Sequence, residues 1–259
     1  MITSHIPKKF ERYFEPFLGG GAVFFHLFSH EKQTKWFISD LNSDLALSYV
    51  TVRDRVKELI SELELHSNNY FKNPSTYYYK IRESNPKGQI EKVSRLIFLN
   101  KTCFNGLYRV NSKGKFNVPV GRYVNPNIVN KENLFEVSKV LQSKDISIKC
   151  QDFEDALKGV GHGDFVYLDP PYQPVSTTAS FTSYTDSDFD FSDQERLYAK
   201  FKALDKKGVK VLLSNSKSGE IIKLFKEFSD GIIEINANRF INSVSQKRTG
   251  HTELLIKNY

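Results

Sequence analysis

The segment Asp164-Phe-Val-Tyr-Leu-Asp169-Pro170-Pro171-Tyr172 joins a short apolar strand to an abrupt stop. Residues 165–168 alternate apolar and β-branched side chains, which predicts a buried strand. Neither proline can donate a backbone hydrogen bond to a sheet, so the strand ends at Asp169. A carboxylate, a backbone carbonyl and an aromatic ring therefore follow the carboxyl end of a strand, where open α/β sheets bind ligands.

These groups suit an amine as substrate. Asp169 and the carbonyl of Pro170 are two acceptors for one –NH2 group, and the ring of Tyr172 can stack on a nucleobase that carries it. An exocyclic amine delocalises its lone pair into the ring. Two acceptors on its hydrogens favour a pyramidal nitrogen, which an electrophile placed in line can then attack without a metal. The alternative is that Asp-Pro-Pro only ends the strand and leaves an exposed acid.

Composition limits the class of protein. The 259 residues are enough for one large domain or a domain with a sizeable insertion. The formal charge of +7 permits a polyanionic partner without requiring one. Cys103 and Cys150 form no metal-ligand spacing or disulfide framework, which indicates a reduced, cytoplasmic protein. Residues 1–8 are too short and polar for a signal peptide, and no apolar run approaches the roughly 18 residues of a membrane span.

A glycine turn follows the first predicted strand. Residues 13–17 read as a strand, Leu18-Gly19-Gly20-Gly21-Ala22 as a turn and residues 23–28 as a helix, the start of a βαβ unit. Asp40 ends the next strand, where an acid can accept from both hydroxyls of a ribose. Phe24 replaces the last glycine of the dinucleotide fingerprint. The pattern therefore favours an adenosine-bearing ligand without a pyrophosphate, such as S-adenosylmethionine, over a simple tight turn.

The middle of the chain reads as an insertion. Residues 43–66 predict two helices, residues 74–84 another and residues 90–104 a further one, which is too much helix for one crossover connection. We therefore expect one domain from residues 10–50 and 144–259, and a second domain from residues 51–143.

The strand at residues 146–150 is followed by Asp152 and Phe153. Asp152 could accept the amine of an adenine with Phe153 against its ring, or it could cap the helix predicted after it. The two roles are compatible.

A hairpin is predicted within the insertion. Residues 107–110 and 115–118 read as strands around Asn111-Ser-Lys-Gly114. Cations and amides gather there, namely Arg109, Lys113, Lys115 and Arg122 with Asn111 and Asn117. A two-stranded ribbon fits the major groove, where arginine pairs with guanine and asparagine with adenine. The hairpin favours double-stranded DNA as a partner; the alternative is an ordinary solvated hairpin.

Three features near the carboxyl end carry weaker predictions. Residues 173–187 form a long polar loop that could close over a base, and residues 239–250 form a basic loop. Ser192-Asp-Gln-Glu195 reads as a capping box. A strand at residues 209–213 ends in Ser214-Asn-Ser216, to which we assign no role.

Four motifs together resemble a known family. They are Phe14-Glu-Pro-Phe-Leu-Gly-Gly-Gly21, Ser39-Asp40, Phe104-Asn-Gly-Leu-Tyr-Arg-Val-Asn-Ser-Lys-Gly114 with Gly121-Arg-Tyr123, and Asp169-Pro-Pro-Tyr172. They resemble the Dam-type (D12 class, α-group) DNA adenine-N6 methyltransferases, in motif order and from about residue 10 to the carboxyl terminus. The tetrapeptide alone is shared with other amine methylases, whereas the hairpin signature is more specific.

The resemblance implies an α/β fold, with a Rossmann-like methyltransferase sheet carrying helices on both faces and a mainly helical target-recognition insertion with a β-hairpin. It assigns residues 10–50 and 144–259 to S-adenosylmethionine binding and catalysis, and residues 51–143 to DNA. The cofactor residues it implies are Phe17, Gly19, Gly21, Asp40, Asp152, Phe153 and Asp169. The catalytic residues that would hold a flipped adenine are Asp169, Pro170 and Tyr172. The DNA-binding residues are Arg109, Asn111, Lys113 and Arg122, with Arg109 reading a base.

The implied reaction is methylation of adenine N6 in duplex DNA at GATC, as in a restriction-modification system or a related role, by a monomer or by a dimer on DNA. One motif departs from the family: the sequence begins at Met1-Ile-Thr-Ser-His-Ile-Pro, where a Lys-Trp-x-Gly-Gly-Lys-like segment is expected before it. We therefore expect weak binding of S-adenosylmethionine.

Other readings stay open. One is an inactive DNA-binding remnant of such an enzyme. Another is a methylase of RNA or of a protein glutamine, although Asp rather than Asn at 169 disfavours the glutamine class and the hairpin favours duplex DNA. The sequence has no carboxylate cluster with a lysine at metal-site spacing, so nothing supports a nuclease.

Overall fold

The computed structural model describes residues 2–30, 34–111, 113–174, 189–237 and 251–259. The chain divides into two compact units, Met1–Leu41 with Asp145–Tyr259, and Asn42–Lys144. The first division lies before the helix that Asn42 caps, whereas a division at residue 50 would cut that helix. Residues 175–187 of the polar loop that could close over a base, and the basic loop at residues 239–250, lie outside the described residues.

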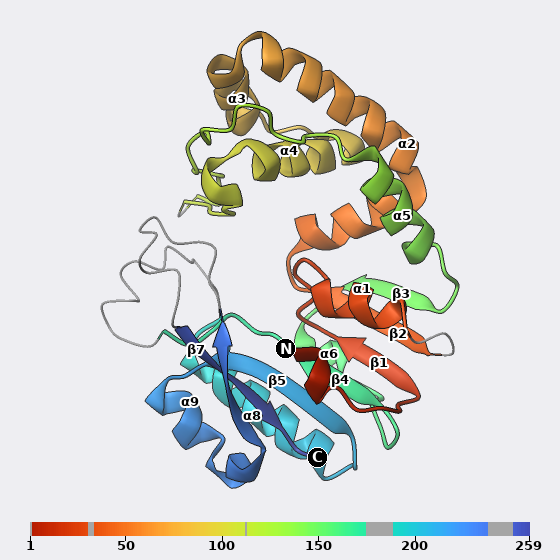
Figure 1. Ribbon diagram of the computed structural model, residues 1–259, viewed down its shortest axis with the longest axis vertical. Coiled ribbons are helices and arrows are strands. Elements are labelled where there is room, and N and C mark those ends of the chain that lie inside the picture. Colours follow the sequence, from red (N-terminus) through yellow and green to blue (C-terminus); the bar gives the residue numbers. More distant parts are fainter. Residues whose placement is uncertain (1, 31–33, 112, 175–188, 238–250) are drawn as a thin grey trace. The chain divides into compact units, whose positions relative to one another are not determined.

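A seven-stranded sheet forms the centre of the first unit, in the order β3-β2-β1-β4-β5-β7-β6 (Figure 1). The strands from β3 to β5 run parallel, and β7 is antiparallel to both β5 and β6. The strand bounds are β1 Arg12–Glu15, β2 Lys35–Asp40, β3 Ile146–Cys150, β4 Phe165–Leu168, β5 Lys210–Ser216, β6 Ile232–Ala237 and β7 His251–Lys257.

Helices cover both faces of this sheet, because successive strand residues point to opposite sides. On one face Tyr13 packs on Trp36 with ring centroids 5.3 Å apart, and Phe24 of α1 meets Trp36 at 5.6 Å. On the other face Phe14 shares a buried core with Phe201 of α8 and with α9. The Rossmann-like α/β fold is thereby confirmed. In the described part of this unit the helices are η1 Ile2–His5, α1 Ala22–Phe28, α6 Phe153–Ala156, α8 Phe191–Asp205, α9 Gly219–Leu224 and η3 Lys226–Gly231.

The second unit is mainly helical. Its elements are α2 Ser43–Lys72, α3 Pro74–Glu83, α4 Gln89–Thr102, η2 Phe104–Gly106 and α5 Lys131–Leu141 (Figure 1). Arg55 has non-helical angles of φ −135° and ψ 35° inside α2, so this stretch is two helical segments joined at a kink, as predicted. Aromatic side chains of α2, α3 and α4 form the core, and the hydroxyl of Tyr78 donates to the carbonyl of Val118 at 2.8 Å. That bond ties the segment after η2 to the helices.

The predicted hairpin is shorter than expected. In residues 107–118, which we call the turn segment, the described residues pair through one antiparallel bridge, Val110 with Phe116, and form no longer strands. The amide of Asn111 donates to the carbonyl of Lys115 at 2.9 Å, and Gly114 closes the turn at φ 69°. The pairing stops because Phe116 and Val118 are buried in the helical core instead of continuing a ribbon.

Candidate functional site

The parallel strands bring the predicted cofactor and catalytic residues to one edge of the sheet. Strands β1, β2, β3 and β4 run in the same direction, so their carboxyl ends lie along a common edge. The glycine turn follows β1, Asp40 ends β2, Asp152 follows β3, and Asp169 follows β4. We call this the carboxyl edge; all of its residues belong to the first unit.

Asp40 holds the glycine turn in place. The amide of Gly19 donates to Oδ2 of Asp40 at 3.0 Å, and the amide of Leu18 donates to the carbonyl of Ser39, also at 3.0 Å. Gly19 has φ 50° and Gly21 has φ 68°, values that favour glycine. A Cβ atom built on Gly19 or Gly20 would meet no atom within 4 Å. The turn therefore offers bare backbone beside open space, as a ligand that approaches the main chain requires.

Two stacked phenylalanines lie beside this turn. The rings of Phe17 and Phe153 have centroids 5.4 Å apart and planes 28° apart. Asp152 caps α6 by accepting from the amide of Glu154 at 2.8 Å, so its predicted capping role is confirmed. Arg196 of α8 donates to Asp152 at 3.2 Å and lies 4.9 Å from the centre of the Phe153 ring. Arg196 therefore contacts both Asp152 and Phe153, the two residues predicted to bind adenine.

Asp169 lies at the end of β4 and is exposed, whereas Pro170 after it is buried. The hydroxyl of Ser214 donates to Oδ1 of Asp169 at 2.6 Å. Desolvation of the carboxylate by the groups packed around it raises the pKa of Asp169, and the bond from Ser214 opposes that increase. Because the carboxylate has access to water, the solvent limits the increase.

Glu15 is a buried acid on the same face of the sheet, with 2% of its surface exposed. Burial raises its pKa to about 8, the hydroxyl of Tyr13 opposes this by donating to it at 2.8 Å, and the charge of Asp169 adds to the increase. At neutral pH Glu15 is therefore mainly protonated, which leaves Asp169 as the charged acid of the pair. Sequence reasoning placed Glu15 within a motif but gave it no role.

Tyr172 is half-buried after the two prolines. Its hydroxyl donates to Oε2 of Glu253 of β7 at 3.4 Å. Burial raises the pKa of Tyr172, so this hydroxyl stays protonated and remains a donor. The ring is thus tethered at its far end beside the exposed carboxylate of Asp169.

The predicted DNA-binding residues lie in the second unit. Arg109 donates to Oδ1 of Asn117 at 2.6 Å, which orients the guanidinium along the turn segment. Asn111 is used within the turn, because its Oδ1 accepts from the amides of Lys113 and Lys115 at 3.0 Å each. Lys113 and Arg122 are exposed.

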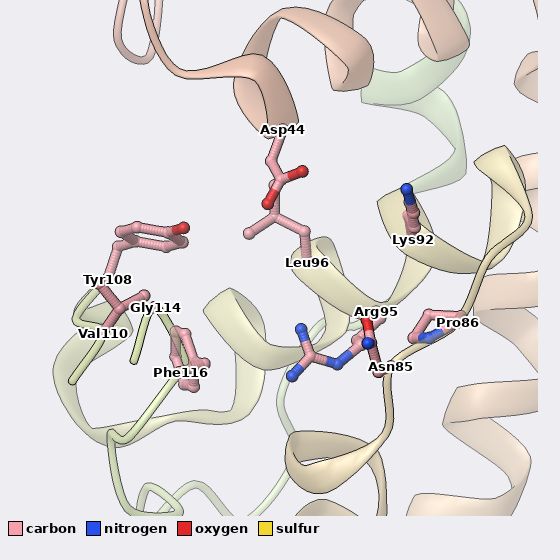
Figure 2. Close-up of a pocket in the computed structure, with 10 residues that line it drawn as sticks. All are labelled: Asp44, Asn85, Pro86, Lys92, Arg95, Leu96, Tyr108, Val110, Gly114 and Phe116. Atoms are coloured by element: carbon pink, nitrogen blue, oxygen red, sulfur yellow. The ribbon is translucent and has the colours of Figure 1, made fainter. Parts of the chain in front are cut away.

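Figure 2 shows a pocket of about 200 Å³ between α4 and the turn segment. Its lining residues are Asp44, Asn85, Pro86, Lys92, Arg95, Leu96, Tyr108, Val110, Gly114 and Phe116. A wider cavity of about 720 Å³ shares Asp44, Arg95 and Phe116 with it and adds Arg82, Lys113 and Lys115. The surface around the turn segment is therefore mainly basic, which suits the phosphate backbone of a nucleic acid.

Two other features are absent from the part of the chain that the structure describes. Among these residues no group of three or more histidine, cysteine or acidic side chains is placed to hold a metal ion. None of the helices described is both long and apolar enough to span a membrane.

Comparison with known proteins gives concordant matches. A family model described as "D12 class N6 adenine-specific DNA methyltransferase" matches residues 1–241. The type II methyltransferase M.MjaIII of Methanocaldococcus jannaschii is 44% identical, over 100% of this chain and 93% of that protein. The type II methyltransferase M1.LlaDCHI of Lactococcus lactis subsp. cremoris is 45% identical, over 98% of this chain and 88% of that protein. The DNA adenine methylase of Escherichia coli is 29% identical, over 99% of this chain and 90% of that protein.

Proposed function

Because the chain belongs to the family of D12 class N6 adenine-specific DNA methyltransferases, we propose that it methylates the adenine of GATC in duplex DNA with S-adenosylmethionine as donor. The observation that carries this proposal is the convergence, at one carboxyl edge, of the Asp169-Pro-Pro-Tyr172 loop with the glycine turn and Asp40. The choice of GATC rests on the resemblance to Dam-type enzymes.

The carboxyl edge fits an adenosyl group. Bare backbone at Gly19 and Gly20 can lie against the ligand, while Gly21 shapes the turn through its φ of 68°. Asp40 at the strand tip can accept from ribose hydroxyls, and Phe17 can flank the purine. Asp152, with Phe153 beside it, would accept from the adenine amine. S-adenosylmethionine supplies, when bound, a methyl group on a positively charged sulfur.

The catalytic loop acts on the nitrogen that receives the methyl group. Asp169 and the carbonyl of Pro170 accept from the two hydrogens of the target N6, and Tyr172 stacks on the flipped base. When N6 takes the methyl group that S-adenosylmethionine would supply, Asp169 would accept the proton that N6 loses and pass it to water. A charged Asp169 is needed for this, and the protonated state of Glu15 favours it.

The second unit would recognise DNA. Arg109 would read a base, with Asn117 holding its guanidinium in place, and Asn111, Lys113 and Arg122 would bind near the turn segment. We therefore assign S-adenosylmethionine binding and catalysis to residues 10–50 and 144–259, and target recognition to residues 51–143. One chain carries all three groups of residues, which supports action as a monomer. Both cysteines are free, which supports a reducing cytoplasmic location.

The test is transfer of a labelled methyl group from S-adenosylmethionine to two duplex oligonucleotides, one with GATC and one with these four bases scrambled. We expect label on the GATC duplex only, recovered as N6-methyladenine, and none with Asp169→Ala. Equal label on both duplexes would refute the GATC assignment while leaving the reaction in place. Label that survives Asp169→Ala would refute the assigned role of the acid.

A further inference from the structure

Strand β5 presents two neighbouring polar residues to opposite faces of the sheet. Ser214 contacts Asp169, whereas the next residue, Asn215, donates from Nδ2 to Oε1 of Gln194 in α8 at 3.0 Å. Asn215 is 0% exposed and Gln194 is 1% exposed. Buried amides need a full set of hydrogen-bond partners, because an unsatisfied buried donor or acceptor destabilises the fold.

Their partners are the backbone of the loop after Asp169. Nε2 of Gln194 donates to the carbonyl of Pro171 at 2.9 Å. Oδ1 of Asn215 accepts from the amide of Gln173 at 3.2 Å and from the amide of Ser216 at 2.8 Å. The two side chains therefore hydrogen-bond to the backbone on both sides of Tyr172, at Pro171 and at Gln173.

Other hydrogen bonds of this loop lie at Gln173 and Tyr172: Ser216 donates to the carbonyl of Gln173, Nε2 of Gln173 donates to Glu220 at 2.6 Å, and the hydroxyl of Tyr172 donates to Glu253. Gln194 provides the hydrogen bond to the carbonyl of Pro171. Pro170 and Pro171 have no amide hydrogen, so they cannot donate to the strand ends around them. The Pro170 carbonyl and the Tyr172 ring must nevertheless keep fixed positions if they are to meet one target base. A misplacement of about 1 Å at a reacting centre can cost roughly a hundredfold in rate.

We propose that Gln194 and Asn215 are positioning residues that fix residues 170–173 and thereby aim the Pro170 carbonyl and the Tyr172 ring at the target adenine. This proposal rests on the proposed function, because it concerns the loop that would hold the base. Neither side chain touches the substrate; both act through the backbone. Residue 194 needs a side chain that can donate to Pro171 and accept from Asn215 at the same time, as the amide of glutamine does at any pH.

The test combines two measurements on the full-length protein. The first is hydrogen–deuterium exchange at the amide of Gln173, which needs neither substrate nor activity. The second is single-turnover methyl transfer, with saturating labelled S-adenosylmethionine, to genomic DNA that lacks methylated adenine. Genomic DNA contains every short target, so the result does not depend on the GATC assignment.

The informative variants are Gln194→Met, which keeps the volume without the hydrogen bonds, and Gln194→Glu. For Gln194→Met we expect exchange at Gln173 to quicken at least tenfold and single-turnover transfer to slow about a hundredfold. A separate steady-state titration of S-adenosylmethionine should give an unchanged KM. Gln194→Glu should keep exchange at Gln173 slow at low pH, where a protonated glutamic acid can donate to Pro171 and accept from Asn215, and should lose this protection as the acid ionises. The double variant Gln194→Met with Asn215→Ala should transfer methyl groups only slightly more slowly than the slower single variant, because both residues hold the same loop.

Two controls on α8 separate positioning from folding. Glu195→Gln alters an exposed neighbour, and Leu197→Ala opens a cavity under the same helix without touching the loop. We expect Glu195→Gln to match the wild type and Leu197→Ala to lower the melting temperature while retaining the rate per folded molecule. The proposal is overturned if Gln194→Met leaves exchange at Gln173 and the rate unchanged, or if Leu197→Ala slows transfer as much. If the wild type methylates no DNA while the variants still show the predicted differences in exchange, the proposed function is refuted. The role of Gln194 and Asn215 in fixing residues 170–173 would then still hold.

Discussion

The Ser214 hydroxyl lies 2.6 Å from Oδ1 of Asp169 and 3.1 Å from the hydroxyl of Tyr167. A serine has one hydroxyl proton, so while it donates to the acid it can only accept from the tyrosine. Burial raises the pKa of Tyr167 further above its usual range, which keeps that donor protonated. The three side chains therefore form a directed chain of hydrogen bonds that ends on the acid and fixes its orientation.

Replacing Ser214 by alanine should slow methyl transfer and shift its pH dependence. The bond from Ser214 lowers the pKa of Asp169, so its loss raises that pKa further. The active form is ionised, so activity is present above the pKa and is lost as pH falls through it; the acid limb of kcat should move to higher pH. We expect a drop of about tenfold in kcat at neutral pH, equivalent to roughly 1.4 kcal/mol. A series of kcat measurements from pH 5 to 9, the assay range we would use, checks both effects.

The matched control is Ser138→Ala, which removes another buried serine hydroxyl, bonded to the Arg53 carbonyl in the second unit. It should reduce stability and leave the acid limb where it is. An unshifted acid limb in Ser214→Ala would show that the hydroxyl does not tune the acid.

Arg109 and Lys113 should differ in what they contribute to DNA binding. Arg109→Lys loses the planar fork that Asn117 orients, so we expect a loss of 10–100-fold for the correct site and weaker discrimination against altered sites. Lys113→Ala should weaken binding to all duplexes alike and reduce the slope of log Kd against log salt by about one. Titrations of matched and altered duplexes at several salt concentrations distinguish the two patterns. Lys139→Ala, on the exposed side of α5, serves as the control for total charge; identical profiles for the two variants would contradict base readout by Arg109.

His66 should make the second unit sensitive to acid. It is buried, its ring lies 2.8 Å from the Tyr77 hydroxyl through Nδ1, and burial lowers its pKa to about 4. The folded state binds this proton less readily than the unfolded state, whose pKa is near 6.5. The stabilisation is therefore complete above pH 6.5 and is lost as pH falls toward 4, by about 3 kcal/mol. Urea unfolding of wild type and His66→Gln across this range gives the difference; parallel curves would show that His66 does not carry the effect.

Two adjacent glycines offer a test of backbone strain alone. A Cβ atom at Gly19 or Gly20 meets no atom within 4 Å, but Gly19 has φ 50° and Gly20 lies outside the left-handed region. Gly19→Ala should cost about 1–2 kcal/mol of unfolding free energy, whereas Gly20→Ala should be neutral or slightly stabilising. Equal melting temperatures for the two variants would contradict a left-handed turn at Gly19.

The parts of the fold that sequence predicted depend on local signals. Two prolines after an apolar strand and three glycines between strand and helix each fix the backbone within a few residues, and the strand, turn and helix found there follow. The division of residues 43–66 into two helical segments and the cap at Asp152 were likewise predicted from short patterns, although the position of the kink at Arg55 was not. The roles assigned to the site residues remain predictions, since no ligand contact tests them.

Contacts between residues that are far apart in the sequence were not predicted. Gln194 and Asn215 are 21 residues apart in the sequence and come from different elements. Gln194 had been read as part of a capping box at residues 192–195, whereas the box uses Asp190 and Asp193. The polar run Ser214-Asn-Ser216 at the end of an apolar strand was the available signal. The predicted strands of the hairpin were too long, because burial of Phe116 in the helical core competes with strand pairing. The sequence of the turn does not reveal this tertiary contact.

The alternation of Ser214 and Asn215 along β5 also restricts how this protein can change during evolution. Substitutions within the strand alter one contact at a time, but the loss or gain of a single residue between Val211 and Ser214 would turn every following side chain to the opposite face. The hydroxyl that reaches Asp169 and the amide that reaches Gln194 would then be lost in one event. Among descendants of this chain, β5 should therefore vary in composition while its length stays constant, and length changes should accumulate in the connections on either side of it.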